Sequence, residues 1–164
     1  MIQDLRFKNN AGLTLVEVVI ASAIILTATL ALLSIHSFYF KTTLSNVDKA
    51  KAAYLAEEAL EAVRYLRDIS WDTNIAPLAQ NTNYGIVFWN NTWQASTTAT
   101  SIQNFTRTIR LSSVYRDSNS DIVYSGGTLD PDTRLVTATV SWQDHGTTTS
   151  RTISTYLTNL YESH

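Results

Sequence analysis

Glu17 is a carboxylate in an otherwise apolar part of the sequence, where a charged side chain is not expected. It lies in the segment GLTLVEVVI, residues 12–20, and an apolar run follows it. Between Leu13 and Phe40 the only other side chain that can carry a charge near neutral pH is His36. An unpaired carboxylate carried to the centre of a bilayer costs about 2.5 kcal/mol or more. We therefore expect Glu17 to have a cationic partner or to lie at a membrane interface.

A second set of residues has the spacing of oxygen ligands. Asp117, Asn119 and Asp121 stand at alternate positions, as in the first half of a calcium-binding loop. The next position holds Ile122 instead of the required Gly, and the twelfth place of such a loop holds Thr128 instead of Glu. These residues are a weak calcium candidate, and the sequence favours an Asx turn.

The rest of the sequence shows no recognisable set of catalytic residues. The chain has no cysteine, which excludes thiol nucleophiles, disulfides and cysteine-based metal sites. His36, His145 and His164 are far apart in the sequence and show neither metal-ligand spacing nor a nucleophile–base pattern. We predict that the protein is not an enzyme and has no cofactor.

The tryptophans allow two interpretations. They are Trp71, Trp89, Trp93 and Trp142. Exposed together, they would form a platform for carbohydrate or another surface. More often such residues belong to a core or a sheet edge, and this interpretation is favoured.

The run that follows Glu17 is long enough to cross a membrane. Val18–Phe40 supplies 23 residues without Asp, Glu, Lys or Arg, and a span needs roughly 20. Arg6 and Lys8 precede it, which favours a cytoplasmic N-terminus and an extracytoplasmic remainder. A cleaved secretory signal is the rival interpretation, but the triplet Ala21-Ser22-Ala23 falls too early in the run for its cleavage site.

A long helix is predicted to carry this run. Residues 13–68 contain neither Pro nor Gly, so nothing forces the chain out of a helix. We expect a transmembrane part at about 14–40 and an amphipathic part at 41–68. The apolar stripe of the amphipathic part comprises Ala52, Ala56, Ala59, Leu60, Val63 and Leu66. Arg64 is placed to pair with Glu61 and with Asp68 on the opposite face.

Residues 69–164 read as an antiparallel sheet. Strands are expected at 84–90, 105–115, 134–142 and 148–157, with a short extra strand at 122–124. Val136, Ala138, Val140 and Trp142 alternate onto one face, and the short turn QDHG predicts a hairpin between the last two strands. The fold class is therefore α+β: a leader at 1–12, a long helix at 13–68 and a sheet domain at 69–164, with the helix packed on the sheet.

The opening segment resembles the processing motif of type IV prepilins and type II secretion pseudopilins. That motif is a short charged leader followed by Gly, an apolar residue, Thr, Leu, an aliphatic residue and Glu. The corresponding residues are Gly12, Leu13, Thr14, Leu15, Val16 and Glu17. The resemblance is specific over about the first 40 residues and becomes a fold-level analogy beyond Asp68.

The resemblance implies how the precursor is processed and assembled. A prepilin peptidase would cut between Gly12 and Leu13 and methylate the new amine of Leu13. Glu17, with Thr14 beside it in the motif, would serve assembly by pairing with the amine of a neighbouring subunit. The implied partners are this peptidase, other pilin or pseudopilin subunits, an inner-membrane assembly platform and the lipid bilayer. Nucleic acid is not expected, because residues 69–164 carry five Arg against seven acidic residues.

The sequence also departs from the common pattern of major pilins. Leu13 stands where Phe is more usual, the apolar run has no Pro, and a C-terminal disulfide is impossible. These differences favour a minor pilin or pseudopilin, anchored in the cytoplasmic membrane before assembly. The alternative is a signal-anchored extracytoplasmic binding or adhesion module that never polymerises.

Overall fold

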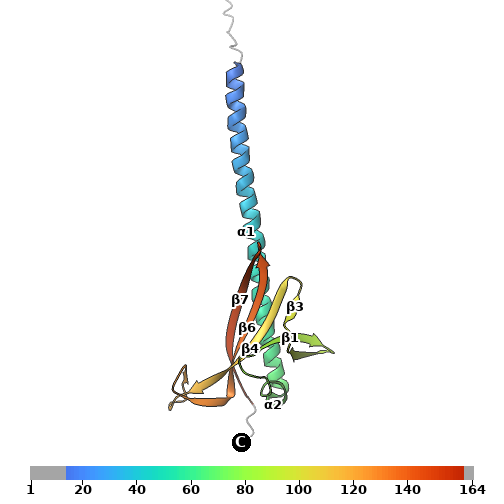
Figure 1. Ribbon diagram of the computed structural model, residues 1–164, viewed down its shortest axis with the longest axis vertical. Coiled ribbons are helices and arrows are strands. Elements are labelled where there is room, and N and C mark those ends of the chain that lie inside the picture. The colour runs from blue at the N-terminus through green and yellow to red at the C-terminus, as the bar shows by residue number, and fades with distance from the viewer. Residues whose placement is uncertain (1–13, 161–164) are drawn as a thin grey trace, which may run out of the picture. The chain divides into compact units, whose positions relative to one another are not determined.

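The computed structural model describes residues 14–160. The chain divides into two compact units, Met1–Leu44 and Ser45–His164, which we call the N-terminal unit and the sheet unit. Helix α1, Leu15–Ile69, starts in the first and ends in the second (Figure 1).

In the N-terminal unit, α1 is apolar on all sides, and its described side chains are exposed. Its hydroxyl groups donate to carbonyls one turn earlier, as Thr29 Oγ1 does to Ile25 O at 2.8 Å and Ser34 Oγ to Leu30 O at 2.9 Å. These hydrogen bonds satisfy the hydroxyl donors without water. By length and composition, α1 is able to cross a membrane.

The sheet unit holds the rest of α1, a one-turn helix and an antiparallel sheet. Its further elements are α2 Trp71–Asn74, β1 Asn83–Trp89, β2 Thr92–Ser96, β3 Thr100–Ile102, β4 Phe105–Arg116, β5 Ile122–Val123, β6 Thr128–Asp144 and β7 Thr147–Thr158. The strand order is β2-β1-β4-β6-β7, and β3 and β5 each pair with β4. The long strands β4, β6 and β7 lie side by side, with the lower part of α1 along them (Figure 1).

The core lies between α1 and one face of the sheet. Ala52, Ala56 and Ala59 are fully buried there, and their small side chains allow the helix backbone to approach the strands closely. Opposite them, β6 contributes Val136, Ala138, Val140 and Trp142. Both stripes were predicted from the sequence, and the α+β fold with a helix on an antiparallel sheet is confirmed.

Local turns explain where the strands reverse. The β6–β7 hairpin turns at His145 and Gly146, which have φ of 50° and 84°. The β1–β2 hairpin turns at Asn90 and Asn91, with φ of 49° and 62°. Positive φ at both central residues is the type I′ turn that suits the twist of a two-residue hairpin, and Asn and Gly tolerate it best.

Several sequence predictions need correction in detail. α2, β2 and β3 were not predicted, and β6 begins six residues earlier than the expected position 134. This extension of β6 contains a bulge opposite Ser113 and Val114, which accommodates Pro131 within a strand. Arg64 pairs with Glu61 as expected, whereas Asp68 is paired with Arg67.

Candidate functional site

Thr14 and Glu17 form a capping box at the start of α1. Thr14 Oγ1 accepts a hydrogen bond from the Glu17 backbone N–H at 3.3 Å. In return, Glu17 Oε2 accepts from the Thr14 backbone N–H at 3.2 Å and from its hydroxyl at 3.3 Å. This reciprocal pattern, with Thr at the N-cap and Glu three residues later, satisfies two first-turn donors at once.

The capping box shows how a carboxylate is accommodated beside an apolar run. The negative charge lies at the positive end of the helix dipole, which is a favourable position. Both side chains are exposed, so the carboxylate that caps the helix is also accessible to a cation. Gly12 and Leu13, at the expected cleavage and methylation point, lie outside the described residues.

The surface that follows Glu17 is the most apolar of the described chain. Large side chains such as Val19, Ile25, Leu32 and Phe38 are each more than half exposed. A helix that is apolar on all sides is stable only when lipid or other helices surround it. This part of α1 therefore needs to be surrounded by lipid or by other helices.

The loop proposed as a weak calcium candidate is closed by its own backbone. Asp117 Oδ1 accepts from the backbone N–H of Asn119 at 2.8 Å and of Asp121 at 3.0 Å. The Asp117 N–H donates to the Asp121 carbonyl at 2.9 Å. These are the hydrogen bonds of an Asx turn. Within residues 14–160, no group of three or more His, Asp or Glu side chains is placed to hold a metal ion.

The four tryptophans divide into two pairs. Trp71 and Trp142 are buried in the core, as the favoured interpretation required. Trp93 is half-buried and Trp89 is 72% exposed, and both belong to the β1–β2 hairpin. The platform interpretation therefore remains only for this hairpin.

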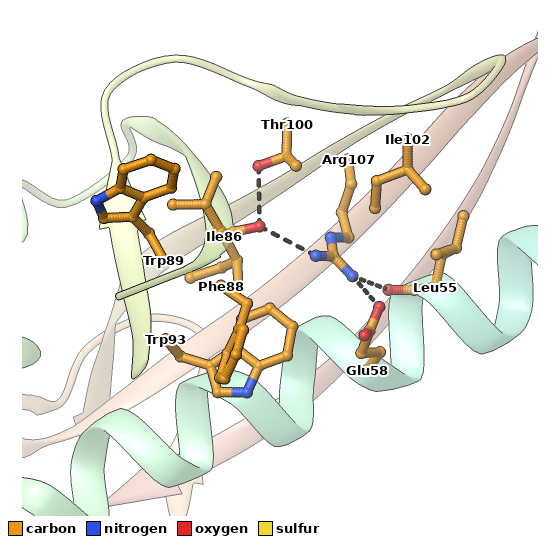
Figure 2. A pocket seen from close by; sticks show the side chains of 10 residues that line it. Leu55, Glu58, Ile86, Phe88, Trp89, Trp93, Thr100, Ile102 and Arg107 are labelled. Atoms are coloured by element: carbon orange, nitrogen blue, oxygen red, sulfur yellow. Dashed lines mark hydrogen bonds and ion pairs between the residues drawn. The ribbon is translucent and has the colours of Figure 1, made fainter. Parts of the chain in front are cut away.

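Arg107 is the polar residue that the sequence analysis missed. It points from β4 into the core and is 2% exposed. Its guanidinium donates to the carbonyls of Leu55 at 3.3 Å and Ile86 at 3.0 Å, and it forms an ion pair with Glu58 of α1 (Figure 2). The guanidinium also lies 5.7 Å from the centre of the Trp93 ring. One side chain thus ties together α1, β1 and β2.

A signal for this residue exists in the sequence. Phe105, Arg107, Ile109 and Leu111 alternate onto one strand face, and all four are buried. A charge at a core-facing position requires a partner, and the carboxylates in AEEALE of α1 are the natural source. The partner, Glu58, becomes identifiable only when the helix is laid on the sheet.

A second polar cluster lies beside the β6 bulge. Asp130 Oδ2 accepts from Arg116 Nε at 2.7 Å, and Asp130 Oδ1 accepts from the Asp132 N–H at 2.9 Å. Burial by itself would raise the pKa of Asp130, but hydrogen bonds from Arg116, Thr133 and Asp132, together with the Arg116 charge, lower it below its ordinary value. The cluster fixes the bulge and has no arrangement for catalysis.

Comparison with known proteins identifies the N-terminal segment. Residues 7–33 match the family model of the prokaryotic N-terminal methylation motif, the hallmark of type IV pilin-like proteins. The match covers Gly12 to Glu17 and much of the apolar run. No curated protein and no solved structure matches the chain.

The motif and the fold agree on one class of protein. A methylation motif at the start of a long apolar helix, continued by a helix packed on an antiparallel sheet, supports a type IV pilin-like precursor. The single described apolar helix fits a membrane-anchored protein of this class.

Proposed function

We propose that this protein is a minor pilin or pseudopilin, a structural subunit of a type IV pilus or a type II secretion-like filament. The observation that carries the proposal is the methylation motif at residues 7–33, which extends into the exposed apolar part of α1. The absence of Pro in this helix and of Cys in the chain supports the choice of a minor subunit.

In this proposal the apolar helix has two environments in succession. A prepilin peptidase cuts between Gly12 and Leu13 and methylates the Leu13 amine. Val18–Phe40 is held in the cytoplasmic membrane, with the sheet unit on the extracytoplasmic side. An assembly platform then moves the subunit into a filament, where the same apolar surface packs against helices of other subunits. Head-to-tail contacts that do not close into a ring generate such a filament.

Glu17 would gain a second partner during assembly. In the isolated chain its carboxylate accepts from Thr14. In the filament it would also pair with the amine of Leu13 on a neighbouring subunit, which fixes the axial position of the incoming helix. Thr14 would keep the first turn of the helix capped while this second contact forms. A buried carboxylate is tolerated when it is paired in this way.

Two substitutions distinguish the role of Glu17 as a helix cap from the role of its negative charge. Gln also serves at the third position of a capping box, so Glu17→Gln keeps the cap and removes the charge, whereas Glu17→Ala removes both. We expect both variants to be cut and methylated but to fail in filament incorporation. The measurement is the amount of the protein in sheared filaments, with intact mass as the control for processing. Normal incorporation of Glu17→Gln would contradict the charge-pairing role.

The rival function is a signal-anchored module that does not polymerise. The intact mass of the membrane-extracted protein distinguishes the two. Loss of residues 1–12 with the gain of one methyl group is the expected result. An unprocessed mass, in a host with active prepilin peptidase, would favour the tethered module.

A further inference from the structure

Strand β7 forms a long edge of the sheet unit. It ends the strand order β2-β1-β4-β6-β7 and pairs with β6 on one side only (Figure 1). β7 has 12 residues, whereas β2, β3 and β5, the other described strands that pair with a single neighbour, have five, three and two. Among the described strands, β7 therefore offers the longest row of unpaired backbone groups to another chain.

The hairpin turn decides which backbone groups of β7 point away from β6. Asp144 and Thr147 are the first and last residues of this turn, so they form a hydrogen-bonded pair, and such pairs alternate with non-hydrogen-bonded pairs along the ladder. Thr139 and Thr152 form a pair of the second kind, in which side chains are closer, and their hydroxyl oxygens lie 3.1 Å apart. The residues of β7 whose N–H and C=O groups point outward are Thr148, Ser150, Thr152, Ser154 and Tyr156. Within residues 14–160, no strand pairs with this side of β7.

This edge lacks the features by which natural sheets protect an edge. β7 contains neither Pro nor Lys, and its register with β6 runs from Thr147 to Thr158 without a bulge. Arg151 is its only charged residue, and most of its side chains are exposed. A long edge without these protections is suited to the addition of a further strand.

The charges beside the edge indicate what the added strand carries. Arg151 lies opposite Val140 of β6, which is buried in the core. Residues opposite each other share a face of the sheet, so Arg151 lies on the side of β7 that faces α1. With Thr149 and with Lys49 of α1, it lines a pocket of about 450 Å³ whose described lining contains no Asp or Glu. Neither Arg151 nor Lys49 has an ion pair among the described residues, so a carboxylate beside Arg151 would interact favourably with both cations.

We propose that β7 is the docking edge for an extended, acidic segment of a partner protein. The segment adds a strand to the sheet, because an extended backbone presents the N–H and C=O groups that match the row on the edge. An acidic side chain of the segment lies beside Arg151 and Lys49. This contact belongs to the sheet unit, and it does not depend on whether the protein enters a filament.

The test uses the full-length protein, as recovered from membranes, in lipid nanodiscs. The probes are three end-blocked peptides of 12 residues that alternate Thr and Val and differ only at the sixth residue, which is Glu, Gln or Lys. Binding is followed by calorimetry and by hydrogen exchange of the outward-pointing amides of β7. We expect saturable binding of the Glu peptide with protection of these amides, and binding of the Lys peptide that is weaker by about tenfold or more.

Two variants test the backbone and the charge separately. Ser150→Pro removes an outward N–H and leaves the hydrogen bonds to β6 in place, so it should weaken binding of the Glu peptide by about tenfold, which is about 1.4 kcal/mol. Ser150→Ala is the matched control, because it keeps the N–H, and it should bind like the wild type. Arg151→Glu should reverse the preference, so that the Lys peptide binds more tightly than the Glu peptide.

Urea unfolding of each variant checks that the sheet unit is folded. Failure of all three peptides to bind the wild type would overturn the proposal, and so would equal affinity of folded Ser150→Pro and Ser150→Ala. If Ser150→Pro does not fold, Arg151→Glu decides, since an unchanged preference for the Glu peptide would contradict the acidic partner. Intact mass and filament incorporation of the wild type test the proposed function independently of peptide binding.

Discussion

The two parts of helix α1 use the same backbone for opposite purposes. In the N-terminal unit its large apolar side chains are exposed on every side, whereas in the sheet unit its buried positions are mostly alanines. The first part provides surface for partners outside the chain. The second part has small side chains at the buried positions, which allows the sheet to pack closely against the helix.

The two parts of the chain also differ in how far apart in the sequence their interacting polar residues lie. In the N-terminal unit, Thr14 and Glu17 are three residues apart and their contacts are local. In the sheet unit, Arg107 meets Glu58 and Leu55 across about fifty positions of sequence. A local motif is recognisable in a single sequence, whereas a long-range ion pair requires the fold.

The largest effect is expected from Arg107→Ala. The substitution removes the donor to two carbonyls and the partner of Glu58, and it leaves a cavity. The free energy of unfolding of the sheet unit should fall by about 3 kcal/mol, measured by urea denaturation with tryptophan fluorescence. Arg110→Ala, on the exposed side of the same strand, should change it by less than about 0.5 kcal/mol. Equal effects of the two variants would show that Arg107 is not the link between helix and sheet.

A second experiment places the same substitution in both parts of α1. Ala59 is fully buried against the sheet, whereas Ala31 is exposed in the N-terminal unit. Ala59→Leu should destabilise the sheet unit by about 2 kcal/mol, because overpacking forces the helix from the strands. Ala31→Leu should leave urea unfolding of the sheet unit unchanged. A tolerated Ala59→Leu would mean that close approach at this position is not required.

Much of the fold was predictable because it follows from periodicity. The alanine stripe of α1 and the alternating stripe of β6 are both patterns of one segment, and both were predicted. β2 and β3 were missed because five and three residues are too few to show a period. Thr14 and Glu17 were found because they belong to a short motif within one segment, whereas Arg107 was missed because its partners lie in α1, β1 and β2.

Asp130 is expected to make the sheet unit less stable as the pH falls into the acid range. Its pKa is lowered in the folded protein by Arg116, Thr133 and Asp132 against the effect of burial. A depressed carboxyl pKa contributes stability that is complete above the unfolded value of about 3.9 and is lost as pH falls through the lower folded value. Asp130→Asn should therefore lose stability near pH 6 and show a shallower decline below pH 4 in urea midpoints. An unchanged pH profile would contradict this linkage.

The smallest effect is expected from an exposed ion pair on the same helix. Glu61 and Glu58 lie one turn apart, but Glu61 pairs with exposed Arg64 while Glu58 pairs with buried Arg107. Solvent screens the first pair, so Glu61→Gln should cost no more than about 0.5 kcal/mol, and high salt should remove the difference. Glu58→Gln should cost more, because the buried guanidinium loses its counter-charge, and salt should not abolish the loss. If both variants behave alike in urea titrations at low and high salt, the helix face toward Arg107 is as open to solvent as the outer face.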